Sequence, residues 1–503
     1  MNLYHDTCVG TGKRIITGFD PTRGLKVADV DYWESDAWSP LSYGIDYDPT
    51  RSFFEQVAEL LFKVPLPNLA VIKSTMENSD FTNGTTDAKN CYLVFGMSRC
   101  EDCLFSLNLV DCKNVVDTVL AQQSELCFDC RSIIRCYDLK FSQDCNQCAN
   151  SAFLSNCQSC NDCFMCVNLT NKRYCFRNKQ LTKADYNQAL SEIDLGSYST
   201  VSRLKQEFEL FAADFPIKYY KGRNNEHSSG NYLNNTKHCI NSYFIGHTEE
   251  VEHSIWVNRV KSSAFHCMYG EGAELIYNTV TTGDNAYNIK FCVECWKDVS
   301  NLEYCIYTCH GASNCFGCVG MRRGSYCVLN KQYSKDDYFR LVAAIKQQMR
   351  QTGEYGRFFP QSMSLNAYNL SEGDLFLPLS KQEALTAGFL WSDQPDNAAP
   401  IAPVLVADSI TELSDAVLEG ELVCITTGKR FRINKTELEF YRRLQLPLPR
   451  VHPIERVRIN SAFLRIHPLR AANCHTCATA ITTTYDTAAR QVLCESCYQQ
   501  SVI

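Results

Sequence analysis

Small and apolar residues recur at every third position between residues 91 and 175. Fourteen cysteines lie on this phase: Cys91, Cys100, Cys103, Cys112, Cys127, Cys130, Cys136, Cys145, Cys148, Cys157, Cys160, Cys163, Cys166 and Cys175. Asparagine and aspartate are frequent at the position just before, and these residues suit tight turns and left-handed backbone. A period of three fits neither an ordinary strand nor an α-helix. It predicts a narrow β-solenoid with twelve residues per turn, in which every third side chain points inward.

A second stretch, residues 236–327, keeps this phase but slips by one residue at several points. It contains nine cysteines: Cys239, Cys267, Cys292, Cys295, Cys305, Cys309, Cys315, Cys318 and Cys327. We expect Ala264 and Cys267 to point inward after one slip, and Cys309 to resume the phase after another. The slips are interpreted as bulges or loop insertions on a second solenoid.

The two arrays end alike, because residues 163–186 and 315–338 match at a constant offset of 152. Each copy then enters a predicted helix, with Thr182 or Ser334 as the N-cap. The expected fold is therefore mainly β with helical caps: two duplicated, narrow, cysteine-lined β-solenoids plus small zinc-ribbon modules. The expected units are a decayed zinc-ribbon-like region (1–86), solenoid 1 (87–180), a helical connector (181–230), solenoid 2 (231–330), a helix and linker (331–402), a basic module with a decayed ribbon (403–470) and a zinc ribbon (471–503).

The strongest metal-binding motif lies near the C-terminus, where C-H-T-C and C-E-S-C are separated by sixteen residues. Two such knuckles around a β-hairpin supply four thiolates, which form the closed tetrahedral shell of a structural zinc site. The predicted cofactor is zinc, and its predicted ligands are Cys474, Cys477, Cys494 and Cys497.

Two other segments repeat the ribbon pattern with an incomplete ligand set. A shift of 466 residues places the four ribbon cysteines on Cys8, Thr11, Ala28 and Asp31. A third copy begins at Cys424 and ends at His452 to Glu455, which together would form only a poor metal site. We therefore expect these two copies to lack zinc.

The cysteine arrays have a favoured interpretation and three alternatives. Free cysteine is among the most buried residue types, so we favour a solvent-excluded ladder of thiols. Zinc or another soft metal on the C-x2-C pairs is the first alternative, and disulfides across the thin core are the second. A catalytic cysteine in His266-Cys267 or Cys309-His310 is less favoured, since sequence neighbours on a strand point in different directions.

Composition and charge narrow the class of protein. The chain has 503 residues, 29 of them cysteine, and a net charge of -7. It begins without an apolar signal region, and no window approaches 18 uninterrupted apolar residues, so we expect reduced thiols, a cytoplasmic location and no membrane partner. The Pro- and Ala-rich residues 393–403 indicate a linker.

The segment 425–470 is basic, with eleven Lys and Arg against three Glu and hence a local charge of +8. Basic side chains beside a small metal module often bind phosphate backbone, although a solvated helical face is the commoner explanation. The nucleic-acid contacts that this hypothesis assigns are Arg442, Arg443 and Arg450.

Several further motifs support a resemblance. They are N-K-Q-Y-S-K (330–335), G-R-F-F-P (356–360), P-L-S-K-Q-E-A-L (378–385) and L-E-F-Y-R-R-L-Q-L-P-L-P-R-V-H-P (438–453). With the two arrays and the final ribbon, the chain resembles an uncharacterised cysteine-rich, zinc-ribbon-ended protein family of candidate-phyla bacteria and large phages. The resemblance covers nearly the whole chain, supports the architecture and implies no biochemical activity. Family members carry C-P-x-C where this chain has residues 452–455.

The leading functional hypothesis is a non-enzymatic zinc-binding scaffold or interaction protein that presents its C-terminal ribbon to a protein or ribonucleoprotein partner. The alternative is a nucleic-acid or ribosome-associated factor that binds phosphate through residues 425–498. A weaker alternative is a thiol redox or metal-storage protein. No small-molecule substrate is evident, because the motifs G-x-x-x-x-G-K-[ST], H-E-x-x-H and G-x-S-x-G are absent.

Overall fold

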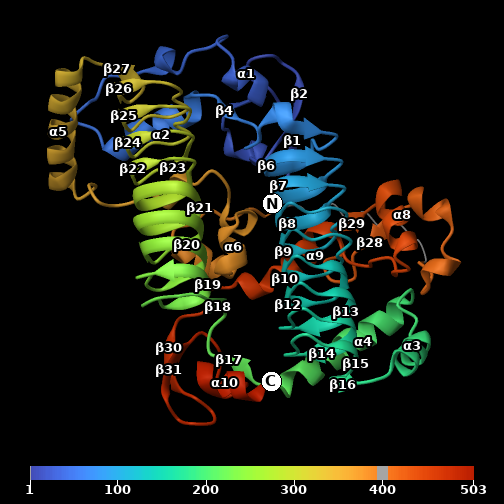
Figure 1. Cartoon of the computed structure of the whole chain (residues 1–503). Coiled ribbons are helices and arrows are strands. Elements are labelled where there is room, and N and C mark those ends of the chain that lie inside the picture. The colour runs from blue at the N-terminus through green and yellow to red at the C-terminus, as the bar shows by residue number, and fades with distance from the viewer. Residues whose placement is uncertain (1, 394–405, 503) are drawn as a thin grey trace.

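The fold is mainly β, as the sequence predicts, and is built on two β-solenoids that lie side by side (Figure 1). The computed structural model describes residues 2–393 and 406–502. N-terminal residues join the two solenoids at one end, and the C-terminal ribbon lies at the other. All but Asp393 of the expected linker 393–403 lies outside the described residues.

Solenoid 1 is a stack of short parallel strands. They are β5 (Met76–Glu77), β6 (Thr82–Lys89), β7 (Tyr92–Glu101), β8 (Leu104–Val110), β9 (Val119–Gln122), β10 (Arg131–Ile134), β11 (Tyr137–Lys140), β12 (Gln143–Asn146), β13 (Ala149–Ser155), β14 (Asn161–Val167) and β15 (Arg173–Phe176), closed by the antiparallel β16 (Lys179–Gln180). Paired residues lie twelve positions apart, from Met76 with Ala88 to Cys163 with Cys175. The predicted twelve-residue turn is confirmed, and the stack begins eleven residues before position 87.

The corners of solenoid 1 explain the period of three. The residue before each inward side chain has a positive φ, for example 54° at Asp102, 53° at Asp111 and 52° at Asn114. This left-handed conformation costs an ordinary residue about 1–2 kcal/mol, and Asn and Asp tolerate it best after glycine. The enrichment of Asn and Asp before the inward phase therefore follows from the backbone, as predicted.

The inward side chains fill a dry core. All fourteen cysteines of the first array are buried there, and residues such as Leu109 and Ile133 lie between them. The thiols donate to nearby carbonyl oxygens, as Cys130 Sγ does to Phe128 O at 3.3 Å. All 29 cysteines are outside disulfides, and those of the array are buried together as a ladder of thiols.

Solenoid 2 repeats this architecture with uneven turns. Its strands are β18 (Gly222–Arg223), β19 (Gly230–Lys237), β20 (Ser242–Glu252), β21 (Ile255–Gly283), β22 (Tyr287–Lys290), β23 (Val293–Trp296), β24 (Ser300–Glu303), β25 (Ser313–Phe316) and β26 (Ser325–Val328), closed by the antiparallel β27 (Lys331–Gln332). Tyr243 pairs with Ile255 twelve residues on, whereas Ile289 pairs with Leu302 thirteen residues on. Each slip in the sequence is thus one extra residue in a turn, as expected.

Two cysteines of the second array do not lie in the solenoid core. The inward residues are Ser263 and His266, and the extra residue follows His266, so the expected inward positions Ala264 and Cys267 are wrong. His266 Nε2 is held 2.9 Å from Thr282 O inside the core. Cys309 is also predicted wrongly, since it is buried outside the core among N-terminal residues.

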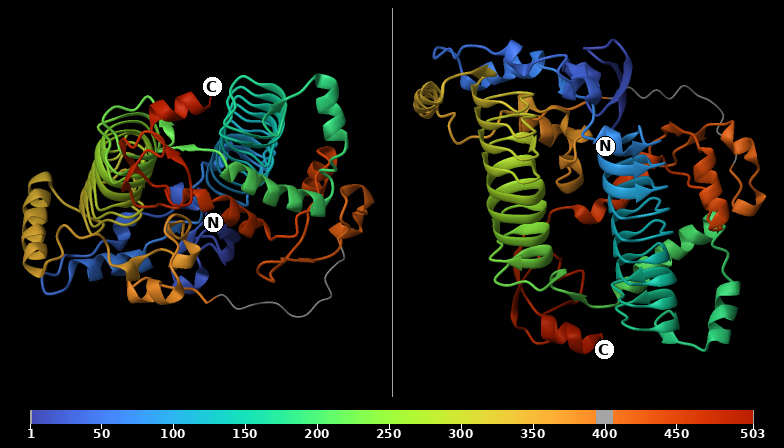
Figure 2. Two further views of the ribbon diagram at one scale, coloured as in Figure 1. Left: turned by 90° about the horizontal axis from the view of Figure 1, so that it is seen from below. Right: turned by 45° about the horizontal axis from the view of Figure 1, so that its top comes forward.

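The helices pack around the two solenoids and at their ends. They are α1 (Val30–Glu34), α2 (Phe53–Lys63), α3 (Lys183–Ser191), α4 (Tyr198–Ala213), α5 (Lys335–Thr352), α6 (Gly373–Phe376), α7 (Lys381–Thr386), α8 (Lys435–Arg443), α9 (Pro453–Asn460) and α10 (Glu495–Ser501). The predicted caps are confirmed, because Thr182 accepts the N–H of Asp185 and Ser334 accepts that of Asp337, both at 3.2 Å. Figure 2 shows α3 and α4 beside solenoid 1 and α5 on the far side of solenoid 2, and α6 is drawn between the two stacks in Figure 1. Within residues 2–393 and 406–502, none of the helices has both the length and the apolar character needed to cross a bilayer.

The remaining strands belong to small modules at the ends and sides of the solenoids. They are β1 (Tyr4–Thr7), β2 (Arg14–Thr17), β3 (Val27–Ala28), β4 (Leu66–Pro67), β17 (Ile217–Lys218), β28 (Leu422–Val423), β29 (Arg430–Phe431), β30 (Arg470–Asn473), β31 (Ala480–Thr483) and β32 (Val492–Leu493).

Candidate metal centre

The four predicted ligands Cys474, Cys477, Cys494 and Cys497 come together in the C-terminal module. The first pair follows β30 in the β30–β31 hairpin, and the second pair begins α10 directly after β32. Their Sγ atoms all lie within 4.8 Å of one another. No other group of three or more Cys, His, Asp or Glu ligand atoms is so close in the part of the chain that the structure describes. Four converging sulfurs of this kind can hold a metal ion in a closed tetrahedral shell.

The backbone around Cys474 favours its thiolate form. Burial raises the pKa of this thiol, but backbone N–H groups, including that of Cys494 at 3.3 Å from Cys474 Sγ, outweigh burial and lower the pKa to about 6. Thiolate is the form of cysteine that binds metal. Cys474 therefore needs little proton release on loading.

The two decayed copies share the backbone of this ribbon. The amide nitrogens of Cys8, Cys424 and Cys474 lie 2.8–2.9 Å from the carbonyl oxygen five residues later. Asp29 N lies 3.3 Å from Cys8 Sγ, as Cys494 N does from Cys474 Sγ. Asp29, and not the expected Ala28, therefore occupies the place of Cys494.

The one-residue error has a simple cause. The N-terminal copy has one more residue between its two halves than the ribbon has, so the second half aligns with a shift of 465 residues and Tyr32, rather than Asp31, replaces Cys497. In the third copy, His452 is the N-cap of α9, its Nδ1 accepting the Ile454 N–H at 3.2 Å. The ligand atoms of Cys424, His452 and Glu455 do not form a metal-binding group among the described residues.

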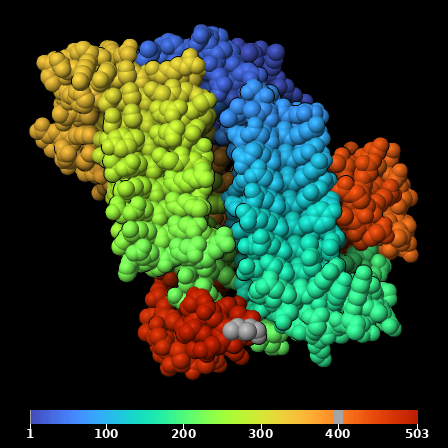
Figure 3. Space-filling view, in the orientation of Figure 1, coloured from blue at the N-terminus to red at the C-terminus, as the bar shows by residue number. Residues whose placement is uncertain are grey.

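The ribbon contacts both solenoids, and in Figure 3 it lies beneath their common end. Tyr498 on α10 donates to Asn168 Oδ1 of solenoid 1 at 3.1 Å. Asn231 of solenoid 2 donates to Thr484 Oγ1 at 3.1 Å. In addition, β32 pairs with β17 in the connector between the solenoids. The sequence carries no signal for these contacts, because they join residues more than 250 positions apart.

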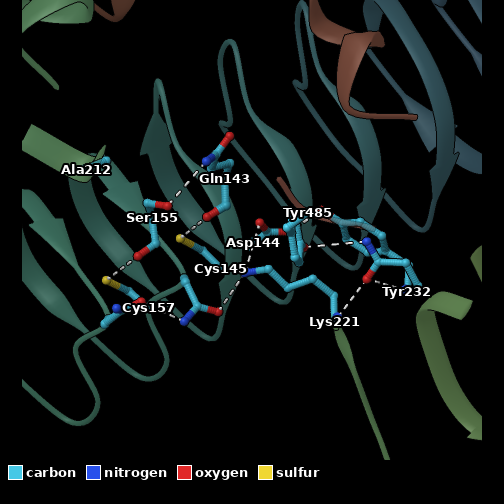
Figure 4. Close-up of polar contacts among 12 residues, drawn as sticks. Gln143, Asp144, Cys145, Ser155, Cys157, Ala212, Lys221, Tyr232 and Tyr485 are labelled. Carbon is cyan, nitrogen blue, oxygen red and sulfur yellow. Dashed lines mark hydrogen bonds and ion pairs between the residues drawn. The ribbon is translucent and has the colours of Figure 1, made fainter. Parts of the chain in front are cut away.

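A polar junction lies where ribbon, connector and solenoids meet (Figure 4). Asp144 of solenoid 1 accepts the hydroxyl of Tyr232 of solenoid 2 at 3.0 Å and pairs with Lys221 of the connector at 3.3 Å. Burial lowers the pKa of Lys221, but Asp144, Tyr485 and Tyr498 together outweigh burial and raise that pKa above its ordinary value. Tyr485 of the ribbon lies beside this group, 3.5 Å from Asn231 Nδ2.

The three arginines assigned to nucleic acid all make intramolecular contacts. Arg442 lies 2.6 Å from Asp415 Oδ1, and Arg443 donates to Asn114 Oδ1 at 2.8 Å. The Arg450 guanidinium lies 4.2 Å from the centre of the Tyr198 ring. The contacts of Arg443 and Arg450 hold the basic module 403–470 against solenoid 1 and α4, whereas that of Arg442 lies within the module.

Comparison with known proteins adds little. No family model and no curated protein matches the chain. Among solved structures, it has a remote similarity to a Desulfovibrio desulfuricans G20 protein described as an acetyltransferase, at 8% identity and a TM-score of 0.12. That match covers 43% of this chain and 66% of the other, and at such a TM-score it carries no argument about fold or activity. Fold and site define the class on their own: a cysteine-lined double β-solenoid with a cluster of four cysteines that could bind a metal.

Proposed function

We propose that the protein is a non-enzymatic zinc-binding scaffold, in which the ribbon holds two rigid solenoids together and is presented to a partner. The observation that carries this proposal is that one small module brings four metal-competent thiols together and contacts both solenoids. Four thiolates in two knuckles favour zinc, which takes tetrahedral sulfur shells without redox chemistry. The 29 free thiols favour a reducing compartment such as the cytoplasm.

The partner that we propose is a protein. Residues 475–480 of the first knuckle are exposed and leave that side of the ribbon open to a partner. Asp415 and Asp408 offset the charges of Arg442 and Arg450, and Arg443 is held on Asn114, so fewer free cations face a phosphate backbone. Binding to a phosphate backbone depends on free cationic side chains, which neutralise phosphates and so release the counterions of the nucleic acid.

Metal analysis of two paired variants tests the zinc assignment. We expect about one zinc per chain in the wild type and none in Cys494→Ser/Cys497→Ser. The matched control Cys8→Ser/Cys424→Ser removes two cysteines of the decayed copies and should retain the zinc. Zinc retained by the first variant, or absent from the wild type, would overturn the assignment.

Salt dependence tests the choice of partner. If the protein does not bind the phosphate backbone, the full chain should show no salt-sensitive affinity for RNA or DNA. Tight binding that weakens steeply with salt would favour a nucleic-acid factor instead, provided that charge reversal of Arg442, Arg443 and Arg450 makes this salt dependence shallower.

A further inference from the structure

The two ends of the solenoid pair are held by related modules, and these differ in how many of the four ribbon cysteines they keep. At the upper end in Figure 1 the N-terminal copy has Thr11, Asp29 and Tyr32 where the ribbon has cysteines. Its core is apolar and large, with Cys8, Trp33 and residues of α2 packed against solenoid 2. This module therefore closes the upper end without a metal.

The upper module also contacts both solenoids. Arg322 of solenoid 2 donates to Ser35 O at 3.0 Å and its guanidinium lies 5.2 Å from the Trp33 ring centre. On the other side, Asn83 of solenoid 1 accepts the N–H of Ala70 at 2.7 Å. The N-terminal module thus joins the upper ends of the two solenoids.

The lower ribbon has almost no core of its own. Its fully buried cluster consists of Cys474, Leu493 and Tyr498. Its hairpin half meets Tyr219 through Thr483, which donates to the Tyr219 carbonyl at 2.7 Å, while its helical half meets solenoid 1 through Tyr498. A module this small depends on its metal for folding, since metal binding free energy is folding free energy in such sites.

We propose that the ribbon is a metal-dependent clasp that closes the lower ends of the two solenoids, while the metal-free upper module acts as a permanent hinge. The proposal rests on the proposed zinc binding. With the metal bound, the hairpin and α10 keep a fixed spacing and cover the Asp144–Lys221–Tyr232 junction. Without it, the two halves of the ribbon separate and the junction meets water.

Contact with water weakens the Asp144–Lys221–Tyr232 junction, because its ion pair depends on being shielded. The Asp144–Lys221 pair is now shielded, with side chains 14% and 18% exposed. Exposed ion pairs contribute little to stability, because water screens them and both side chains lose freedom on pairing. Loss of the cover therefore weakens this polar contact between the lower ends, so that the distance between them becomes longer and more variable.

Two label pairs in the full chain test the clasp. One pair, at the exposed positions Gln158 and Lys237, reports on the lower ends, and the other, at Lys89 and Arg323, reports on the upper ends. Genetically encoded spin labels avoid the many cysteines. Chelation should lengthen and broaden the lower distance distribution, zinc should restore it, and the upper distribution should not change.

The outcomes separate the two proposals. A chelator that removes measured zinc but leaves the lower distribution unchanged would overturn the clasp and leave zinc binding intact. Opening of both pairs together would overturn the hinge. A protein purified without zinc, whose lower distribution does not respond to added zinc, would overturn both proposals.

A variant that keeps all four cysteines gives a second test. Tyr498→Phe removes the hydroxyl that contacts Asn156 and Asn168 of solenoid 1. It should still bind zinc, but half-opening should need at least about fivefold less chelator, because the two hydrogen bonds of this hydroxyl are lost. Gln499→Ala, on the exposed face of the same helix, should behave as wild type. Equal chelator sensitivity of both variants would contradict the clasp.

Discussion

Arg456 on α9 lies 2.5 Å from Asp117, a corner residue of solenoid 1, and both side chains are buried. The same guanidinium lies 3.0 Å from Glu437 and 2.7 Å from the Tyr441 hydroxyl, and it stacks over the Phe105 ring at 4.6 Å. One cation thus joins the basic module to the solenoid through two carboxylates.

Replacing Arg456 should therefore be costly. Arg456→Met leaves Asp117 and Glu437 buried without a counter-charge, and breaking a buried pair in this way costs about 3–5 kcal/mol. Chemical denaturation followed by circular dichroism measures the loss. Arg432→Met, which removes an exposed partner of Glu421, is the control and should cost about 0–1 kcal/mol. Similar losses for both variants would show that the buried network does not anchor the module.

We expect folding stability to depend on pH through the Glu294 carboxyl on solenoid 2. Its Oε2 is buried without a hydrogen-bond partner among the described residues, and burial raises the pKa of this carboxyl from 4.5 to about 8. The unfolded chain loses the proton near pH 4.5 and the folded chain only near pH 8. Folding stability attributable to Glu294 therefore falls as pH rises between these values and is constant above pH 8.

Glu294→Gln should remove this pH dependence. At pH 8 the variant should be more stable than wild type by roughly 4 kcal/mol, whereas at pH 4 the two should be alike. Urea unfolding across pH 4 to 9 measures the difference. Glu274→Gln, at an exposed position of the same solenoid, should change neither value. A variant that is less stable than wild type at pH 8 would contradict the assignment.

Two exposed glutamines on solenoid 1 test the corner geometry. Gln147 has φ 55°, whereas Gln158 does not have positive φ. Gln147→Val should cost about 1–2 kcal/mol, because a β-branched residue is strained in left-handed backbone. Gln158→Val should be neutral or slightly stabilising, since valine suits extended backbone. Thermal unfolding of both variants compares them, and equal melting temperatures would refute the corner assignment.

Thiol reactivity should divide the cysteines by location. Those in the solenoid cores are buried, and burial raises the pKa of, for example, the Cys127 thiol to about 12, so they should not label in the native protein. Chelation should expose four fast-reacting thiols at the ribbon, and full denaturation should expose all 29. Counting modified thiols by mass spectrometry checks this. Fast labelling of many array cysteines in native protein would refute the dry core.

The regular parts of the molecule were predictable because local backbone geometry imposes them. The twelve-residue turn follows from the cysteine spacing, the corners from Asn and Asp, and the four-cysteine cluster from two knuckles. The site of each inserted residue was not predictable, because Ser263 and Ala264 are both small enough for the core. The sequence gives no sign of the Arg456–Asp117 pair either. The two residues are 339 positions apart, and the sequence does not distinguish Arg456 from the exposed arginines around it.

Anomalous diffraction from crystals of the full chain, measured on both sides of the zinc absorption edge, tests the central claim most directly. We predict a single zinc peak among the Sγ atoms of Cys474, Cys477, Cys494 and Cys497, at about 2.3 Å from each. No peak there, or peaks inside the solenoid cores, would contradict the account.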